Sequence, residues 1–74
     1  MTTEEKALYL TNDFSWFDYQ KKEKEQFYKD LLTFDHSRIE KAYEWYINQH
    51  YDYMARGEVL WWAIDYIKGE RDFL

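Results

Sequence analysis

Residues 58–68 read EVLWWAIDYIK, a stretch in which apolar side chains recur at three- and four-residue steps. With about 100° of rotation per residue, as in an α-helix, the apolar side chains gather on one side. These residues are Val59, Leu60, Ala63, Ile64, Tyr66 and Ile67. Trp61 falls on the opposite side, with Asp65 and Lys68. The pattern predicts a helix buried along one side, with Trp61 facing outward.

The preceding stretch predicts another helix over residues 38–56. The same helical spacing places Ile39, Tyr43 and Tyr46 toward the core. Trp45 falls on the far side of that helix, and Tyr51 on a flank. Gly57 allows two interpretations: it ends this helix in a left-handed conformation, or it lies within one long helix that continues into residues 58–68.

Capping boxes predict where helices begin, since a hydroxyl and an acid three residues later can each accept a hydrogen bond from the first-turn backbone. Three such pairs occur: Thr2 with Glu5, Ser15 with Asp18, and Ser37 with Glu40. They predict two further helices, over residues 3–11 and 16–34. The chain has no proline and only two glycines, which leaves few helix breakers.

These signals predict a single domain over residues 1–74, folded as a compact all-α bundle of three to four helices. We expect the third and fourth helices to form most of the core and the second to pack across them. With no cysteine there is no disulfide, and no apolar run approaches the length of about 18 residues that spans a membrane. We therefore expect a cytoplasmic protein, in the host cytoplasm if a phage encodes it.

Chemistry-bearing motifs are missing from the sequence. There is no glycine-rich phosphate loop, no cysteine nucleophile and no serine in a recognisable catalytic context. Neither His36 nor His50 has a second histidine or a cysteine at helical spacing. We expect neither enzyme activity nor a metal or cofactor.

Aromatic side chains are the most informative feature of the composition: five Phe, four Trp and eight Tyr among 74 residues. This is more ring surface than one small core normally absorbs, and exposed Trp and Tyr commonly anchor partners. The alternative is that the bundle buries these rings on more than one side of each helix. The candidate partner-binding residues are Trp45, Trp61, Arg56, Arg38, Asp52, Tyr19 and Tyr51.

The net charge of −5 opposes direct binding to nucleic acid or to anionic lipid. The sequence therefore favours a small acidic protein-interaction module that blocks or regulates a larger protein, as inhibitors encoded by phages and mobile elements do. Two alternatives stay open. One is a self-associating homodimer that buries its spare rings, and the other is a DNA mimic whose carboxylates occupy a basic groove.

Overall fold

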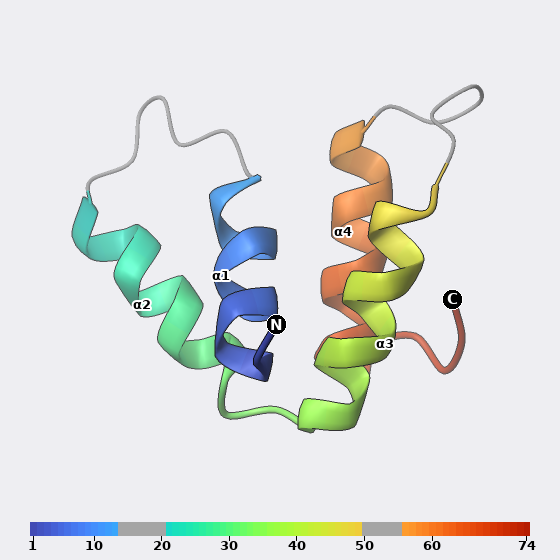
Figure 1. Ribbon diagram of the computed structural model, residues 1–74, viewed down its shortest axis with the longest axis horizontal. Coiled ribbons are helices and arrows are strands. Elements are labelled where there is room, and N and C mark those ends of the chain that lie inside the picture. Colours follow the sequence, from blue (N-terminus) through green and yellow to red (C-terminus); the bar gives the residue numbers. More distant parts are fainter. Residues whose placement is uncertain (14–20, 50–55) are drawn as a thin grey trace.

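The computed structural model describes residues 1–13, 21–49 and 56–74, which form four α-helices and no strand. The helices are α1 (Thr3–Asn12), α2 (Lys21–Leu31), α3 (His36–Ile47) and α4 (Arg56–Ile67). Helix α3 packs most extensively against α4, while α1 packs against both α3 and α2 (Figure 1). The predicted all-α bundle is confirmed.

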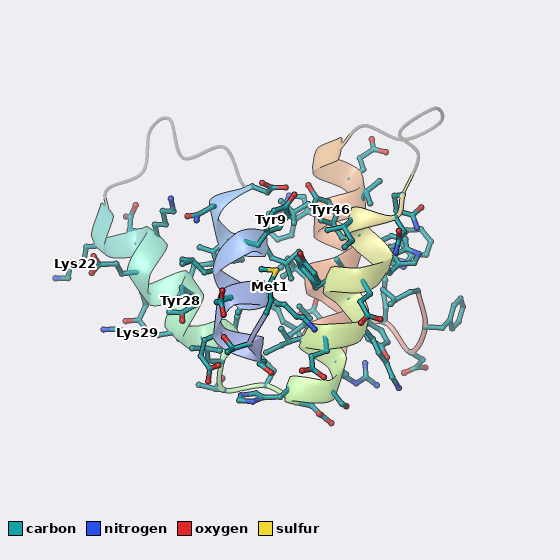
Figure 2. The ribbon with its side chains drawn as sticks, viewed as in Figure 1. Met1, Tyr9, Lys22, Tyr28, Lys29 and Tyr46 are labelled. Carbon is teal, nitrogen blue, oxygen red and sulfur yellow. The ribbon has the colours of Figure 1, made fainter. Side chains whose placement is uncertain are left out.

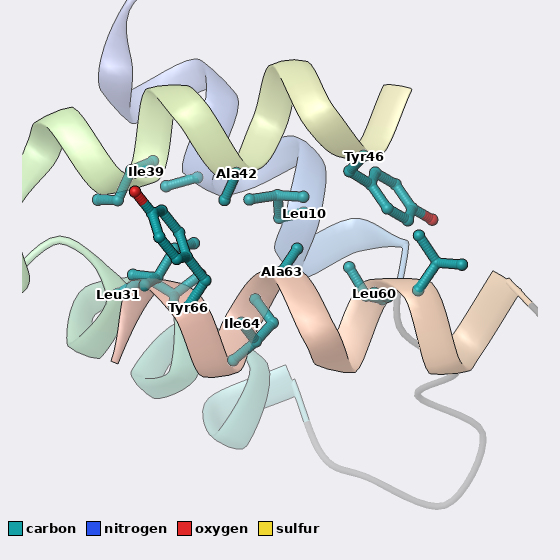
Figure 3. Close-up of a cluster of buried hydrophobic side chains, with 12 residues drawn as sticks. Leu10, Leu31, Ile39, Ala42, Tyr46, Leu60, Ala63, Ile64 and Tyr66 are labelled. Atoms are coloured by element: carbon teal, nitrogen blue, oxygen red, sulfur yellow. The ribbon is translucent and has the colours of Figure 1, made fainter. Parts of the chain in front are cut away.

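The core draws on all four helices. Leu10 of α1, Leu31 of α2, Ile39 of α3 and Ile64 of α4 are each buried almost completely (Figure 3). All six residues predicted for the buried side of α4 are buried, because the apolar stripe of that helix is wide and uninterrupted. The second helix differs from expectation: α2 packs mainly on α1 and makes only minor contact with α3 and α4.

Helix α1 begins as the sequence predicts. Thr2 Oγ1 accepts a hydrogen bond from the Glu5 backbone N–H at 3.1 Å. The Glu5 carboxylate accepts in return from the Thr2 backbone N–H at 3.1 Å, which completes the capping box. Ala7 and Leu10 then face the core. The pair Ser15 and Asp18 lies outside the described residues.

Helix α3 begins and ends earlier than predicted. Its N-cap is Asp35, whose carboxylate accepts from the Ser37 N–H at 2.9 Å and the Ser37 hydroxyl at 2.8 Å. A carboxylate is the stronger acceptor, so Ser37 becomes a donor and not the cap. At the other end, the side-chain amides of Asn48 and Gln49 donate to carbonyls of the last turn, at 2.8 and 3.2 Å. These bonds satisfy the free end of the helix at Ile47.

The two glycines differ in conformation, and Gly57 has neither of the roles predicted for it. Helix α4 begins at Arg56, so Gly57 lies in its first turn; it neither ends α3 nor joins α3 to α4 in one helix. Gly69 is left-handed, with φ of 81°. The Gly69 N–H donates to the Tyr66 carbonyl, and the Glu70 N–H to the Asp65 carbonyl. This pair of bonds is a Schellman motif, which turns the chain back after α4.

Candidate functional site

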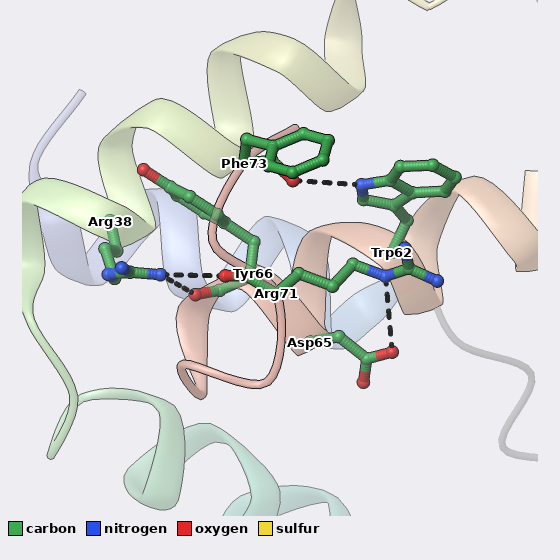
Figure 4. Close-up of polar contacts among 6 residues, drawn as sticks. All are labelled: Arg38, Trp62, Asp65, Tyr66, Arg71 and Phe73. Carbon is green, nitrogen blue, oxygen red and sulfur yellow. Dashed lines mark hydrogen bonds and ion pairs between the residues drawn. The ribbon is translucent and has the colours of Figure 1, made fainter.

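Two of the predicted binding residues, Arg38 and Trp45, lie together on the side of α3 that packs on α4. The Trp45 ring is partly buried, with its centroid 6.0 Å from that of Trp62. Arg38 Nη1 donates to the carbonyl oxygens of Tyr66 at 2.7 Å and Arg71 at 3.1 Å (Figure 4). The interpretation of this side as outward-facing is wrong, because Trp45 packs against the core and Arg38 makes internal bonds.

The segment after α4 folds back on the same side of the bundle. The Arg71 guanidinium carbon lies 3.9 Å from the centroid of the Trp62 ring, and Arg71 Nε lies 3.8 Å from an Asp65 carboxylate oxygen. Trp62 Nε1 donates to the Phe73 carbonyl at 3.4 Å. Together with Arg38, these contacts hold the C-terminal segment against α3 and α4.

Trp61 lies where the sequence predicts, on the exposed side of α4, with 52% of its surface accessible. It is one residue from Trp62 and so points about 100° away from the seam between α3 and α4. The structure therefore separates Trp61 from Trp45 and Arg38. Tyr19, Tyr51, Asp52 and the side chain of Arg56 lie outside the described part of the chain.

A second group of exposed apolar side chains lies over α1 and α3. Six large apolar side chains are exposed among the described residues, and four of them belong to this group: Met1, Leu8, Tyr9 and Ile47, which expose between 38% and 65% of their surface. With the partly buried ring of Tyr43 they form what we call the apolar face. Figure 2 shows Met1 and Tyr9 at the junction of the two helices.

Contacts of Tyr43 join Tyr9 and Met1 within the apolar face. The rings of Tyr9 and Tyr43 meet edge to face, with centroids 5.4 Å apart and planes at 89°. The Tyr43 hydroxyl donates to the Met1 sulfur at 3.0 Å. Ile47 follows Tyr43 by one helical turn, and Leu8 lies about 100° around α1 from Tyr9. The edge-to-face contact restricts the two rings, so less side-chain conformational entropy is lost when a partner binds.

Sequence reasoning missed the apolar face, although part of its signal was present. Ala7, Leu10 and Thr11 lie on the buried side of α1, which puts Leu8 and Tyr9 on the outer side. Helical spacing also puts Ile47 on one flank of α3, beside Glu40 and Glu44. The pairing of Tyr9 with Tyr43 joins residues far apart in the chain, and no helical pattern specifies which two helices will lie side by side.

Carboxylates surround the apolar face. Glu4 and Glu5 occupy the outer side of α1, and Glu40 and Glu44 the outer side of α3; all four are exposed. The hydrogen bond from the Thr2 backbone N–H lowers the pKa of Glu5. Lys6 brings a positive charge, with its ammonium 5.7 Å from the Tyr43 ring centroid. Within the described stretches, no three His, Asp or Glu side chains are placed to share a metal ion.

Among the described residues, no helix is long and apolar enough to cross a membrane. Comparison with protein-family models found no match, and neither did comparisons with curated proteins or with solved structures.

Proposed function

We propose that this chain is a small protein-interaction module that binds a surface of a larger protein and thereby inhibits or regulates it. The observation that carries the proposal is the apolar face: four large exposed side chains and the Tyr43 ring lie on two packed helices, and Tyr43 contacts both Tyr9 and Met1. Contiguous exposed apolar surface with polar residues at its edge is typical of protein-binding sites, whereas isolated exposed side chains are not.

Trp61 is a second anchor in this proposal. It is the exposed ring that the sequence predicts, and Trp is the residue type that most often dominates interface energies. It lies on α4, whereas the apolar face lies on α1 and α3. Substituting each surface separately shows which of them binds.

The test is capture of the partner by variants of the full chain. The tagged chain is expressed in the cells that carry its gene, and the proteins it retains are compared with those retained by a Leu8→Ser, Ile47→Ser variant. The retained partner is then purified, and its affinity is measured by calorimetry. We expect Tyr9→Ser to weaken binding by about tenfold or more, the effect of losing an interface anchor.

A control carries Glu25→Ser and Lys29→Ser, two substitutions to the same residue at exposed positions on α2. We expect it to bind like the wild type. A partner that binds all apolar-face variants with unchanged affinity would contradict the assignment of this face. If Trp61→Ala alone abolished that binding, the interaction would belong to α4.

A further inference from the structure

We infer that the partner's contacting surface is basic: an apolar centre flanked by Lys or Arg side chains that meet the carboxylates around the apolar face. This inference rests on the proposed function and adds the chemical class of the partner. It comes from the placement of charge on α1 and α3, which is a separate observation from the exposure of the apolar side chains.

On α3 the acidic side chains share a side with the apolar face. Glu40 and Glu44 are one turn apart, and Ile47 follows Glu44 by three residues, so the three line one edge of the helix. The Thr3 hydroxyl donates to a Glu40 carboxylate oxygen at 3.1 Å, which ties this edge to the start of α1. Glu44 forms no ion pair with any described residue, and its charge is left for a partner.

On α1 the arrangement repeats. Glu4 precedes Leu8 by one turn, and Glu5 precedes Tyr9 by one turn, so both carboxylates border the exposed apolar side chains. Two cations, Lys6 and Lys41, lie on the same two helices, while Arg38 is turned to α4 and bonded there. Four carboxylates thus border the face against three ammonium groups, those of Lys6, Lys41 and the Met1 N-terminus, so the surface keeps a net negative charge that attracts positive charge.

The same charges disfavour a second copy of this chain as the occupant. In a two-fold symmetric dimer each apolar face would meet its own equivalent, and the carboxylates of one copy would approach those of the other. Like charges brought together across an interface are strongly unfavourable. A basic surface on another protein is attracted by these carboxylates. This attraction also speeds the encounter between the two molecules.

The test uses two synthetic amphipathic helices of about five turns as probes. They share one leucine stripe; Lys and Arg flank it in the first peptide, and Glu in the second. Backbone amide shifts of the isotope-labelled full chain are followed by NMR during titration with each peptide. We expect the basic peptide to shift the amides of Leu8, Tyr9 and Ile47 and to bind more tightly than the acidic one.

Two charge variants sharpen the result. Glu40→Gln with Glu44→Gln removes two charges beside the apolar face and keeps the Thr3 acceptor, whereas Glu25→Gln with Glu70→Gln removes two exposed charges elsewhere. We expect the first pair to weaken binding of the basic peptide by about three- to tenfold and the second pair to leave it unchanged.

Equal affinity of the two peptides, shifts confined to other helices, or no binding of the basic peptide would overturn the inference. Concentration-dependent shifts of the apolar face without any peptide would also overturn it, in favour of a second copy of the chain. Failure here leaves the proposed function standing if capture still depends on Tyr9. Loss of that dependence would remove the proposed function itself.

Discussion

At the scale of single residues, the N-cap of α3 makes the stability of the fold depend on pH. The hydrogen bond from the Ser37 hydroxyl, with a second from the Ser37 backbone N–H, lowers the pKa of Asp35. A group whose pKa is lower in the folded chain binds fewer protons there than in the unfolded chain. Its stabilising effect is therefore complete above the ordinary pKa of Asp and is lost as the pH falls through the folded value.

The substitution Asp35→Asn separates the cap from its charge. Asn is also a favourable N-cap, so the helix is retained, but the side chain no longer titrates. We expect the urea midpoint of the variant to fall less steeply than that of the wild type below about pH 5. Asp72→Asn, at an exposed position in the C-terminal segment, is the control. Identical pH profiles for wild type and Asp35→Asn would contradict this account of the cap.

Arg38 also acts at the residue scale, because one side chain holds the last turn of α4 and the segment after it. We expect Arg38→Ala to lower the free energy of unfolding by about 2 kcal/mol, since two charge-assisted hydrogen bonds and the stack on Tyr66 are lost. The free energy of unfolding of Arg38→Lys should lie between those of the wild type and Arg38→Ala, because an ammonium group lacks the planar, two-pronged donor geometry of a guanidinium group. Chemical denaturation measures these free energies of unfolding, with Lys41→Ala as an exposed control. Equal stabilities of Arg38→Ala and Lys41→Ala would disprove the role of Arg38 in holding the end of α4.

At the scale of the helices, α4 is the one that could be predicted in most detail. Six residues of its buried side and the exposure of Trp61 follow from spacing alone. The end of α3 could not be predicted in this way, because it depends on which of Asn48, Gln49 and Gly57 stops the helix. Side-chain amides that bond the last carbonyls act before the chain reaches the glycine. Hydrophobic periodicity predicts which face of a helix is buried better than it predicts where the helix ends.

The two glycines give opposite predictions for the same substitution. A Cβ at Gly57 meets no atom within 4 Å, and the residue is helical, so Gly57→Ala should stabilise the protein by up to about 1 kcal/mol. At Gly69 there is also space, but φ of 81° is costly for alanine, so Gly69→Ala should destabilise it by about 1 kcal/mol. Thermal unfolding of both variants checks the pair. Destabilisation by Gly57→Ala would mean that α4 does not include this residue.

At the scale of the whole molecule, composition predicted that rings would be left over but not where they would lie. The aromatic surplus is divided by the packing: Trp45 and Trp62 join the seam under the C-terminal segment, while Tyr9 and Tyr43 adjoin over α1 and α3. That division depends on which helices are neighbours. The short first helix, which contributes Leu10 to the core and Tyr9 to the surface, contacts both α2 and α3.

Charge around the apolar face also predicts the state of the protein in solution. We expect light scattering to give a mass near the 9.4 kDa of one chain over a wide range of concentrations. The reason is that pairing of two identical acidic faces is unfavourable. A stable dimer at micromolar concentration would favour the self-associating alternative.

The central claim is that another protein covers the apolar face, and site-specific photocrosslinking tests it most directly. A photoreactive phenylalanine analogue is placed at Leu8, at Ile47 or, as a control on α2, at Glu25 in the full chain, in the cells that carry its gene. The account predicts that Leu8 and Ile47 crosslink to the same second protein and that Glu25 does not. Crosslinks only between copies of this chain, or equal crosslinking from all three positions, would contradict it.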